Sequence, residues 1–152
     1  MIALLSSATG KILRFIKSKY YALQYTEETN DNTSDTYNLA QFKSYSPNDC
    51  QNYVSQSIWF GFGGSSSANM DYPMTSDWWA NTTGETTTWN WTGTAYFRNW
   101  IINNNLYNDY GIQGQTYSVP TNIQIGDYIY MPGHVLFVTT INDVNSNGYT
   151  DY

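Results

Sequence analysis

The chain has little of two chemically important residue types: its 152 residues include one cysteine, Cys50, and one histidine, His134. A single cysteine excludes an intramolecular disulfide bond and leaves the redox compartment open. Protein zinc sites draw about three or four ligands mainly from these two residue types, so metal catalysis is an unfavourable interpretation. We therefore expect neither a metal nor an organic cofactor.

Charged side chains are also scarce, at 12% of the chain, which is about half of the usual share. Asparagine, threonine, serine, glutamine and 15 tyrosines supply the polar surface instead. The formal charge of −6 argues against nucleic acids and anionic membranes as partners. Because this composition is common in secreted bacterial proteins, we expect an extracellular or cell-surface protein.

Long apolar runs are missing too, so the sequence predicts no membrane span. The N-terminal sequence MIALLSSATG has a short apolar run with no basic residue before it, which makes it a poor signal peptide. An export signal is therefore expected to lie upstream or to have been removed. Most of the basic residues lie in the first 19 positions, at Lys11, Arg14, Lys17 and Lys19.

The length suits one domain over residues 1–152, and we expect a monomer. Helical periodicity predicts a basic amphipathic helix over 10–25 and another helix over 94–106, with Tyr96, Phe97, Trp100 and Ile101 on one side. From residue 116 onward the runs TYSVP, IGDYIYM and HVLFVTTI predict short strands. Helices that precede strands indicate an α+β fold, with N-terminal helices packed on a small antiparallel sheet.

The clearest helix is predicted to begin at Cys50, with Asp49 as its N-cap. The apolar stripe Cys50, Tyr53, Val54, Ser57 and Ile58 has helical spacing and ends in a glycine-rich stretch. A helix N-terminus lowers the pKa of a thiol, and its backbone N–H groups can form part of an oxyanion hole. A lone cysteine is equally often a small buried residue, so position alone leaves both interpretations open.

His134 opens the predicted strand HVLFVTTI, and taken alone it is more readily a surface residue without a role. The presence of both Cys50 and His134 changes this interpretation, because a Cys/His catalyst brings one residue of each kind together from distant parts of a chain. Here Cys50 opens a helix in the first half and His134 opens a strand in the second half. The sequence is therefore compatible with a thiol catalyst, although periodicity does not demonstrate the contact.

At these residues the chain resembles a known family. The segment DCQNYVSQSIWFGFGG (49–64) is similar to the motif DCTNFVSQ…GG of the bacterial Putative amidase domain family, which is related to the NlpC-type and CHAP cysteine hydrolases. The segments around Pro73-Met74 and Trp78-Trp79, then 86–101 and 123–143, resemble further blocks of that family in the same order. The resemblance runs from about residue 38 to the C-terminus and leaves the basic helix 1–25 outside its best-matching part.

This resemblance implies a papain-like fold and thiol-dependent cleavage of an amide bond. It assigns Cys50 as the nucleophile and His134 as the general base and then the general acid. Members of the family are typically exported or surface-associated, so cell-wall peptides or peptidoglycan fragments are the expected substrates.

Such sites usually have a third polar residue that orients the histidine. A hairpin centred near residues 145–146 would pair His134 with about position 157, past the end of the sequence at Tyr152. The family's HTND-like motif, which follows this hairpin, is absent here. We therefore expect either that the C-terminus is truncated and the third residue lies beyond it, or that another side chain serves. Asp151 is the only nearby acid in that strand and is the candidate within the sequence.

Two other patterns compete with the thiol interpretation. Asp143, Asn145, Asn147 and Asp151 match the first positions of an EF-hand calcium loop, although Asx-Gly turns produce the same pattern and a hairpin turn is favoured.

The six tryptophans suggest the other alternative, a non-enzymatic carbohydrate- or cell-wall-binding module that uses surface Trp and Tyr. Large aromatic residues more often build the core. Trp78 and Trp79 are adjacent and point in opposite directions if extended, so one of them is a candidate for the substrate groove.

Overall fold

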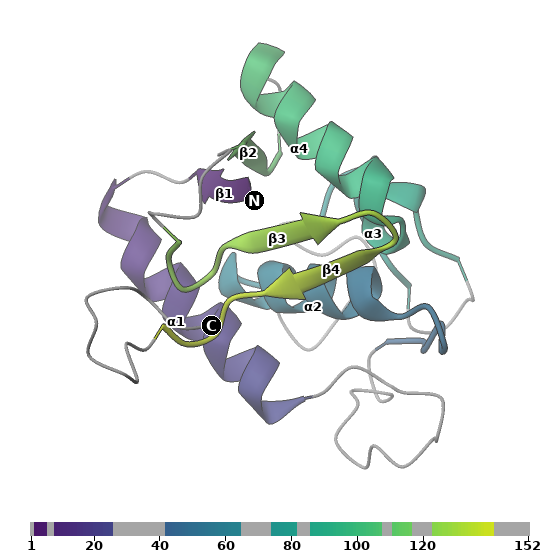
Figure 1. The fold of residues 1–152 in the computed structure, drawn as a ribbon, viewed down its shortest axis with the longest axis horizontal. Coiled ribbons are helices and arrows are strands. Elements are labelled where there is room, and N and C mark those ends of the chain that lie inside the picture. The colour runs from purple at the N-terminus through teal and green to yellow at the C-terminus, as the bar shows by residue number, and fades with distance from the viewer. Residues whose placement is uncertain are drawn as a thin grey trace.

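The computed structural model describes residues 2–5, 8–25, 42–64, 74–81, 86–107, 111–116 and 123–141. Within these ranges, four helices and four strands follow one another in the order β1 (Ile2–Leu5), α1 (Ala8–Gln24), α2 (Cys50–Gly61), α3 (Trp89–Thr92), α4 (Thr94–Tyr107), β2 (Gln113–Thr116), β3 (Tyr128–Met131) and β4 (His134–Phe137) (Figure 1). The predicted α+β class is confirmed. None of the helices in these described ranges is long and apolar enough to cross a bilayer.

The strands form one antiparallel sheet in the order β2-β1-β3-β4. β3 and β4 make a hairpin whose register pairs Met131 with His134 and Tyr130 with Val135. Its turn contains Gly133 at φ +80, a left-handed conformation that glycine adopts without steric cost. The N-terminal strand β1 was not predicted, because four apolar residues carry too little periodicity to distinguish a strand.

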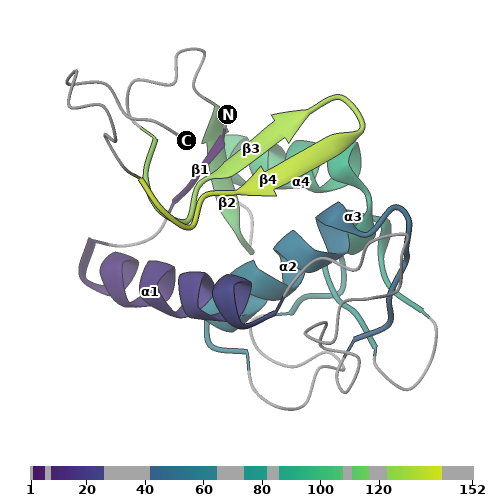
Figure 2. The same cartoon turned by 60° about the horizontal axis from the view of Figure 1, so that its bottom comes forward.

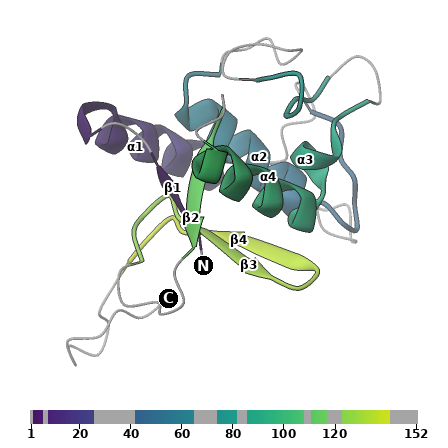
Figure 3. The same cartoon turned by 90° about the horizontal axis from the view of Figure 1, so that it is seen from above.

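Helix α2 is the centre of the molecule and packs against α1, α3 and β4 (Figures 1 and 2). Seen from above, α2 and α4 lie on one side of the β3–β4 hairpin (Figure 3). Aromatic residues fill much of the surrounding core, and the largest fully buried ones are Trp59, Trp78, Trp91, Tyr21, Tyr128, Phe42 and Phe97. Trp78 lies against Trp91, with their ring centroids 4.7 Å apart.

The helix starting at Cys50 is confirmed, as are the helices expected over 10–25 and 94–106, with small shifts at their ends. The one-sided apolar stripe predicted for α2 is wrong, because ten of its residues are buried and several of them are polar. Tyr96 was expected on the same side of the helix as Phe97, but Tyr96 is 58% exposed whereas Phe97 is fully buried. Of the strands expected from residue 116 onward, β3 and β4 lie within the predicted runs IGDYIYM and HVLFVTTI, whereas the run TYSVP lies outside the described residues except for its first residue, which ends β2.

Candidate active site at the start of helix α2

Cys50 is the first residue of α2 and is 7% exposed. Asp49 occupies the N-cap position as predicted, but its side chain makes no hydrogen bond to the backbone amides of the helix start. Its Oδ1 instead accepts hydrogen bonds from the Tyr45 backbone N–H, at 2.8 Å, and from Asn52 Nδ2, at 2.9 Å. The expected side-chain cap is therefore absent, and the carboxylate ties the preceding loop to the first turn of the helix.

Asn52, two residues after the cysteine, is fully buried and uses both ends of its amide. Its Nδ2 donates to the Lys43 carbonyl oxygen at 2.8 Å as well as to Asp49. Its Oδ1 accepts from the indole N–H of Trp91 at 2.7 Å. One buried amide thus fixes the loop before α2, the first turn of α2 and helix α3 relative to one another, and buried groups paired in this way give a site a defined geometry.

Gln51 extends this network to the sheet. The Tyr128 hydroxyl of β3 lies 2.9 Å from Gln51 Oε1 and 3.1 Å from the Thr94 carbonyl oxygen. Gln51 Nε2 donates to Ser55 Oγ at 3.0 Å, and Ser55 in turn donates to the Trp91 carbonyl oxygen at 2.7 Å. The residue next to the cysteine is therefore held by Ser55 of α2 and Tyr128 of β3, which in turn bond to α3 and α4.

The phenol of Tyr128 has a strongly raised pKa. Burial raises the pKa of its phenol well above the ordinary value, and negative charge on Cys50 acts in the same direction. A charge on Tyr130 adds to the rise, and the Arg98 guanidinium opposes it. Tyr128 therefore remains a neutral hydrogen-bonding group close enough to Cys50 to sense its charge.

Helix α1 packs against the same helix. Tyr53 donates through its hydroxyl to the Ala22 carbonyl oxygen at 2.6 Å, and Gln56 Oε1 accepts from the Tyr21 hydroxyl at 2.8 Å. The polar residues of the segment DCQNYVSQ therefore have structural partners on several elements. The sequence pattern indicates the importance of this segment but not these supporting roles, because the partners lie far away along the chain.

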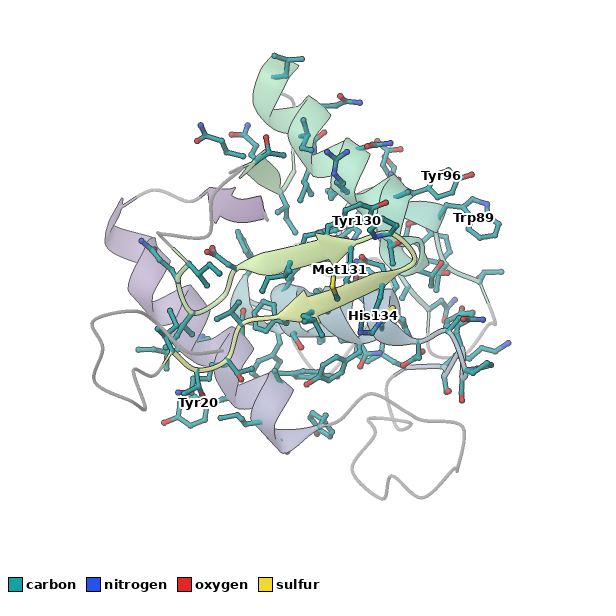
Figure 4. The ribbon with its side chains drawn as sticks, viewed as in Figure 1. Tyr20, Trp89, Tyr96, Tyr130, Met131 and His134 are labelled. Carbon is teal, nitrogen blue, oxygen red and sulfur yellow. The ribbon has the colours of Figure 1, made fainter. Side chains whose placement is uncertain are left out.

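His134 begins β4, the strand that packs on α2. The ribbon places the β3–β4 turn at the same end of the molecule as the start of α2 (Figures 1 and 2). Val135 is 2% exposed and Leu136 is 45% exposed, so burial alternates along β4, and His134 belongs to the more exposed set, opposite Met131 (Figure 4). The structure thus brings the two chain segments together and leaves His134 half-buried at the rim.

The remaining predicted site residues differ in burial and in whether the structure describes them. Trp78 is fully buried in the aromatic core, and a substrate contact by one of the adjacent pair Trp78-Trp79 stays a prediction. Trp79 is half-buried. Asp151 and the calcium-loop residues Asp143, Asn145, Asn147 and Asp151 lie outside the described residues. Within the described ranges, no group of three or more His, Cys, Asp or Glu side chains is arranged to hold a metal ion.

Comparison with known proteins agrees with the motif at Cys50. The family model described as Putative amidase domain matches residues 13–150. The match begins within α1, so it reaches further towards the N-terminus than the resemblance from residue 38 suggested. No curated protein and no solved structure matches the chain significantly. Because the family model covers most of the sequence, the chain belongs to the Putative amidase domain family.

Proposed function

We propose that the protein is a thiol-dependent amidase in which Cys50 is the nucleophile and His134 is the general acid and base. Family membership points to amide hydrolysis, and the chain contains one thiol and one imidazole with which to perform it. The observation that carries the proposal is the position of Cys50 at the N-terminus of a central helix on which the strand of His134 packs.

The helix start favours a thiolate for an electrostatic reason. The aligned peptide dipoles of α2 place partial positive charge at its N-terminus, which stabilises an anion there. The twelve-residue helix is rigidly held, since its first turn is bonded to a loop, to α3 and to β3. A nucleophile fixed in this way loses little further freedom when it meets a substrate.

The proposed reaction is acyl transfer in two steps. The Cys50 thiolate attacks the amide carbonyl carbon, the backbone N–H groups at the helix start stabilise the oxyanion, and His134 protonates the departing nitrogen. A water molecule, deprotonated by His134, then attacks the thioester, and the carboxylic acid leaves with regeneration of the thiolate. For this chemistry the His134 imidazole must lie within hydrogen-bond reach of the sulfur.

Cell-wall peptides, including peptidoglycan fragments, are the substrate class we propose, with action outside the cell or at its surface. The low content of charged residues and the acidic balance fit an uncharged or weakly charged substrate better than a polyanion. The motif around Cys50 resembles that of the Putative amidase domain family, and the relationship of this family to the NlpC-type and CHAP cysteine hydrolases is part of the proposal.

The test is turnover of peptidoglycan fragments by the intact chain, followed by mass spectrometry. Cys50→Ala and His134→Ala should each lower turnover by at least about a hundredfold, the range of a lost acid–base or nucleophilic group. Leu136→Ala is the matched control, because Leu136 is exposed on the same strand and on the same face as His134. Unchanged turnover in Cys50→Ala would identify another nucleophile and refute the proposal.

A further inference from the structure

An exposed aromatic pair lies where α3 joins α4. Trp89 and Tyr96 are stacked, with ring centroids 5.7 Å apart and an interplanar angle of 28°. They are 72% and 58% exposed, whereas Trp59, Trp78 and Trp91 are fully buried. Large aromatic residues are usually buried on folding, so a stacked pair left in solvent indicates a surface used for binding.

Gly93 makes this arrangement possible. A Cβ atom at this position would lie 2.8 Å from Tyr96 Cδ2 and 2.9 Å from the Trp89 carbonyl oxygen. The backbone of Gly93 itself bonds to both helices, through its N–H to Trp89 O at 2.8 Å and through its carbonyl oxygen to the Phe97 N–H at 2.9 Å. The glycine therefore lets the tyrosine ring lie close over the chain, next to the indole.

The pair is fixed relative to the candidate active site. Trp91, two residues after Trp89, points inward and donates from its indole N–H to Asn52 in the first turn of α2. Figure 4 places Trp89 and Tyr96 at the same end of the molecule as the β3–β4 turn and His134. The aromatic pair thus stands on a rigid support that is bonded two residues away from Cys50 along α2.

The chain segment that carries the pair is polar but uncharged. Residues 86–97, with the sequence TTTWNWTGTAYF, contain no ionisable side chain except the tyrosine hydroxyl. Thr, Asn and Tyr side chains offer both donors and acceptors. A neutral ligand with one apolar face and a rim of hydroxyl groups matches such a surface, whereas an anionic or cationic ligand would find no counter-charge in this segment.

We propose that Trp89 and Tyr96 form a carbohydrate-binding subsite in which the apolar C–H face of a pyranose ring stacks on the aromatic pair. Neighbouring amide and hydroxyl groups contact the sugar hydroxyls. The subsite is separate from the thiol chemistry, so sugar binding does not depend on whether Cys50 is the nucleophile. A glycan held there would lie next to the proposed cleavage site.

The experiment titrates the intact chain with chitohexaose and with cellohexaose, and follows binding by calorimetry. Wild type should bind at least one of the two saturably, and Trp89→Ala or Tyr96→Ala should weaken binding by at least about tenfold, as expected for an exposed aromatic anchor. Tyr20→Ala is the matched control, because Tyr20 is 68% exposed on α1, away from the pair (Figure 4), and its loss should leave affinity unchanged.

A second variant tests the geometry of the pair without removing a ring. Gly93→Ala should displace Tyr96 and weaken sugar binding, with circular dichroism confirming an unchanged fold. Saturable binding of neither sugar, or equal binding by wild type and Trp89→Ala, would overturn the proposal. It would also be overturned if only a sugar-free cell-wall peptide bound and Trp89→Ala abolished that binding.

Discussion

Replacement of Asn52 by alanine should destabilise the protein more than any surface substitution, because it removes the amide that joins three segments. Asn52 is fully buried, donates to Lys43 O and to Asp49 Oδ1, and accepts from Trp91 Nε1. The substitution leaves the Trp91 N–H and the Lys43 carbonyl without this partner. A buried group deprived of its partner costs about 1–3 kcal/mol, so we expect a loss of about 2–5 kcal/mol.

The assay is urea unfolding at neutral pH, followed by the fluorescence of the buried tryptophans. Asn90→Ala is the matched control, since the Asn90 side chain makes a single exposed hydrogen bond to Asp77 O, at 2.9 Å. That change should stay within about 0.5 kcal/mol of wild type. The double variant Asn52→Ala/Trp91→Phe should cost less than the sum of the two single changes, because each single change already removes the shared bond. Strict additivity, or an Asn52→Ala variant as stable as Asn90→Ala, would refute this account of the network.

Three further changes test other parts of the structure. Burial raises the pKa of Tyr128, so in the unfolded state the phenol ionises first, and above about pH 10 this group should lower stability by about 1.4 kcal/mol per pH unit. Tyr128→Phe should remove that alkaline slope in urea titrations, and an unaltered slope would contradict the assignment. Trp78→Ala empties a fully buried position and should cost about 3–5 kcal/mol by the same assay, where a loss below about 1 kcal/mol would contradict its role in the core. Gly64→Ala would place a Cβ atom inside the Trp59 indole, whereas the Cβ atom of Gly133→Ala would meet open space and cost only about 1–2 kcal/mol for the φ of +80. Gly64→Ala should therefore lower the thermal midpoint more than Gly133→Ala does. The reverse order would contradict the packing around Trp59.

The sequence predicts the start of α2 correctly but not its environment. The helical stripe and the N-cap position identify Cys50 as the first helical residue. Periodicity cannot reveal that Gln51 and Asn52 are buried, because their burial depends on Tyr128 and Trp91, which lie far away along the chain. A polar helix face is usually a solvent face, and here it is interior only because its groups find partners.

The short strand β1 shows a second limit of prediction from the sequence. β1 contains four residues, and its place in the sheet depends on pairing with Gln113–Thr116 and with Tyr128. No local signal marks such a strand. The exposure of Trp89 and Tyr96 could not be predicted either, because the helical stripe placed Tyr96 on one side with Phe97, whereas Tyr96 is 58% exposed and Phe97 is fully buried.

The candidate catalytic pair could be named from the sequence, because Cys50 and His134 are each unique and the motif around the cysteine resembles a hydrolase family. Their mutual geometry could not be predicted, since it depends on how the β3–β4 hairpin sits on α2. The hairpin register pairs His134 with Met131 on the more exposed side of β4. The proposed mechanism requires that this register bring the imidazole within hydrogen-bond reach of the Cys50 sulfur.

The most direct test of the account is the rate at which iodoacetamide alkylates Cys50 as a function of pH, in wild type and in His134→Ala. The chain has one thiol, so mass spectrometry counts a single product. We predict rapid alkylation of wild type well below about pH 8.5, where an ordinary thiol is protonated, and a shift of the profile towards that value in His134→Ala. A wild-type profile that rises only near pH 8.5 and does not change in His134→Ala would contradict the proposed thiolate–imidazole catalyst.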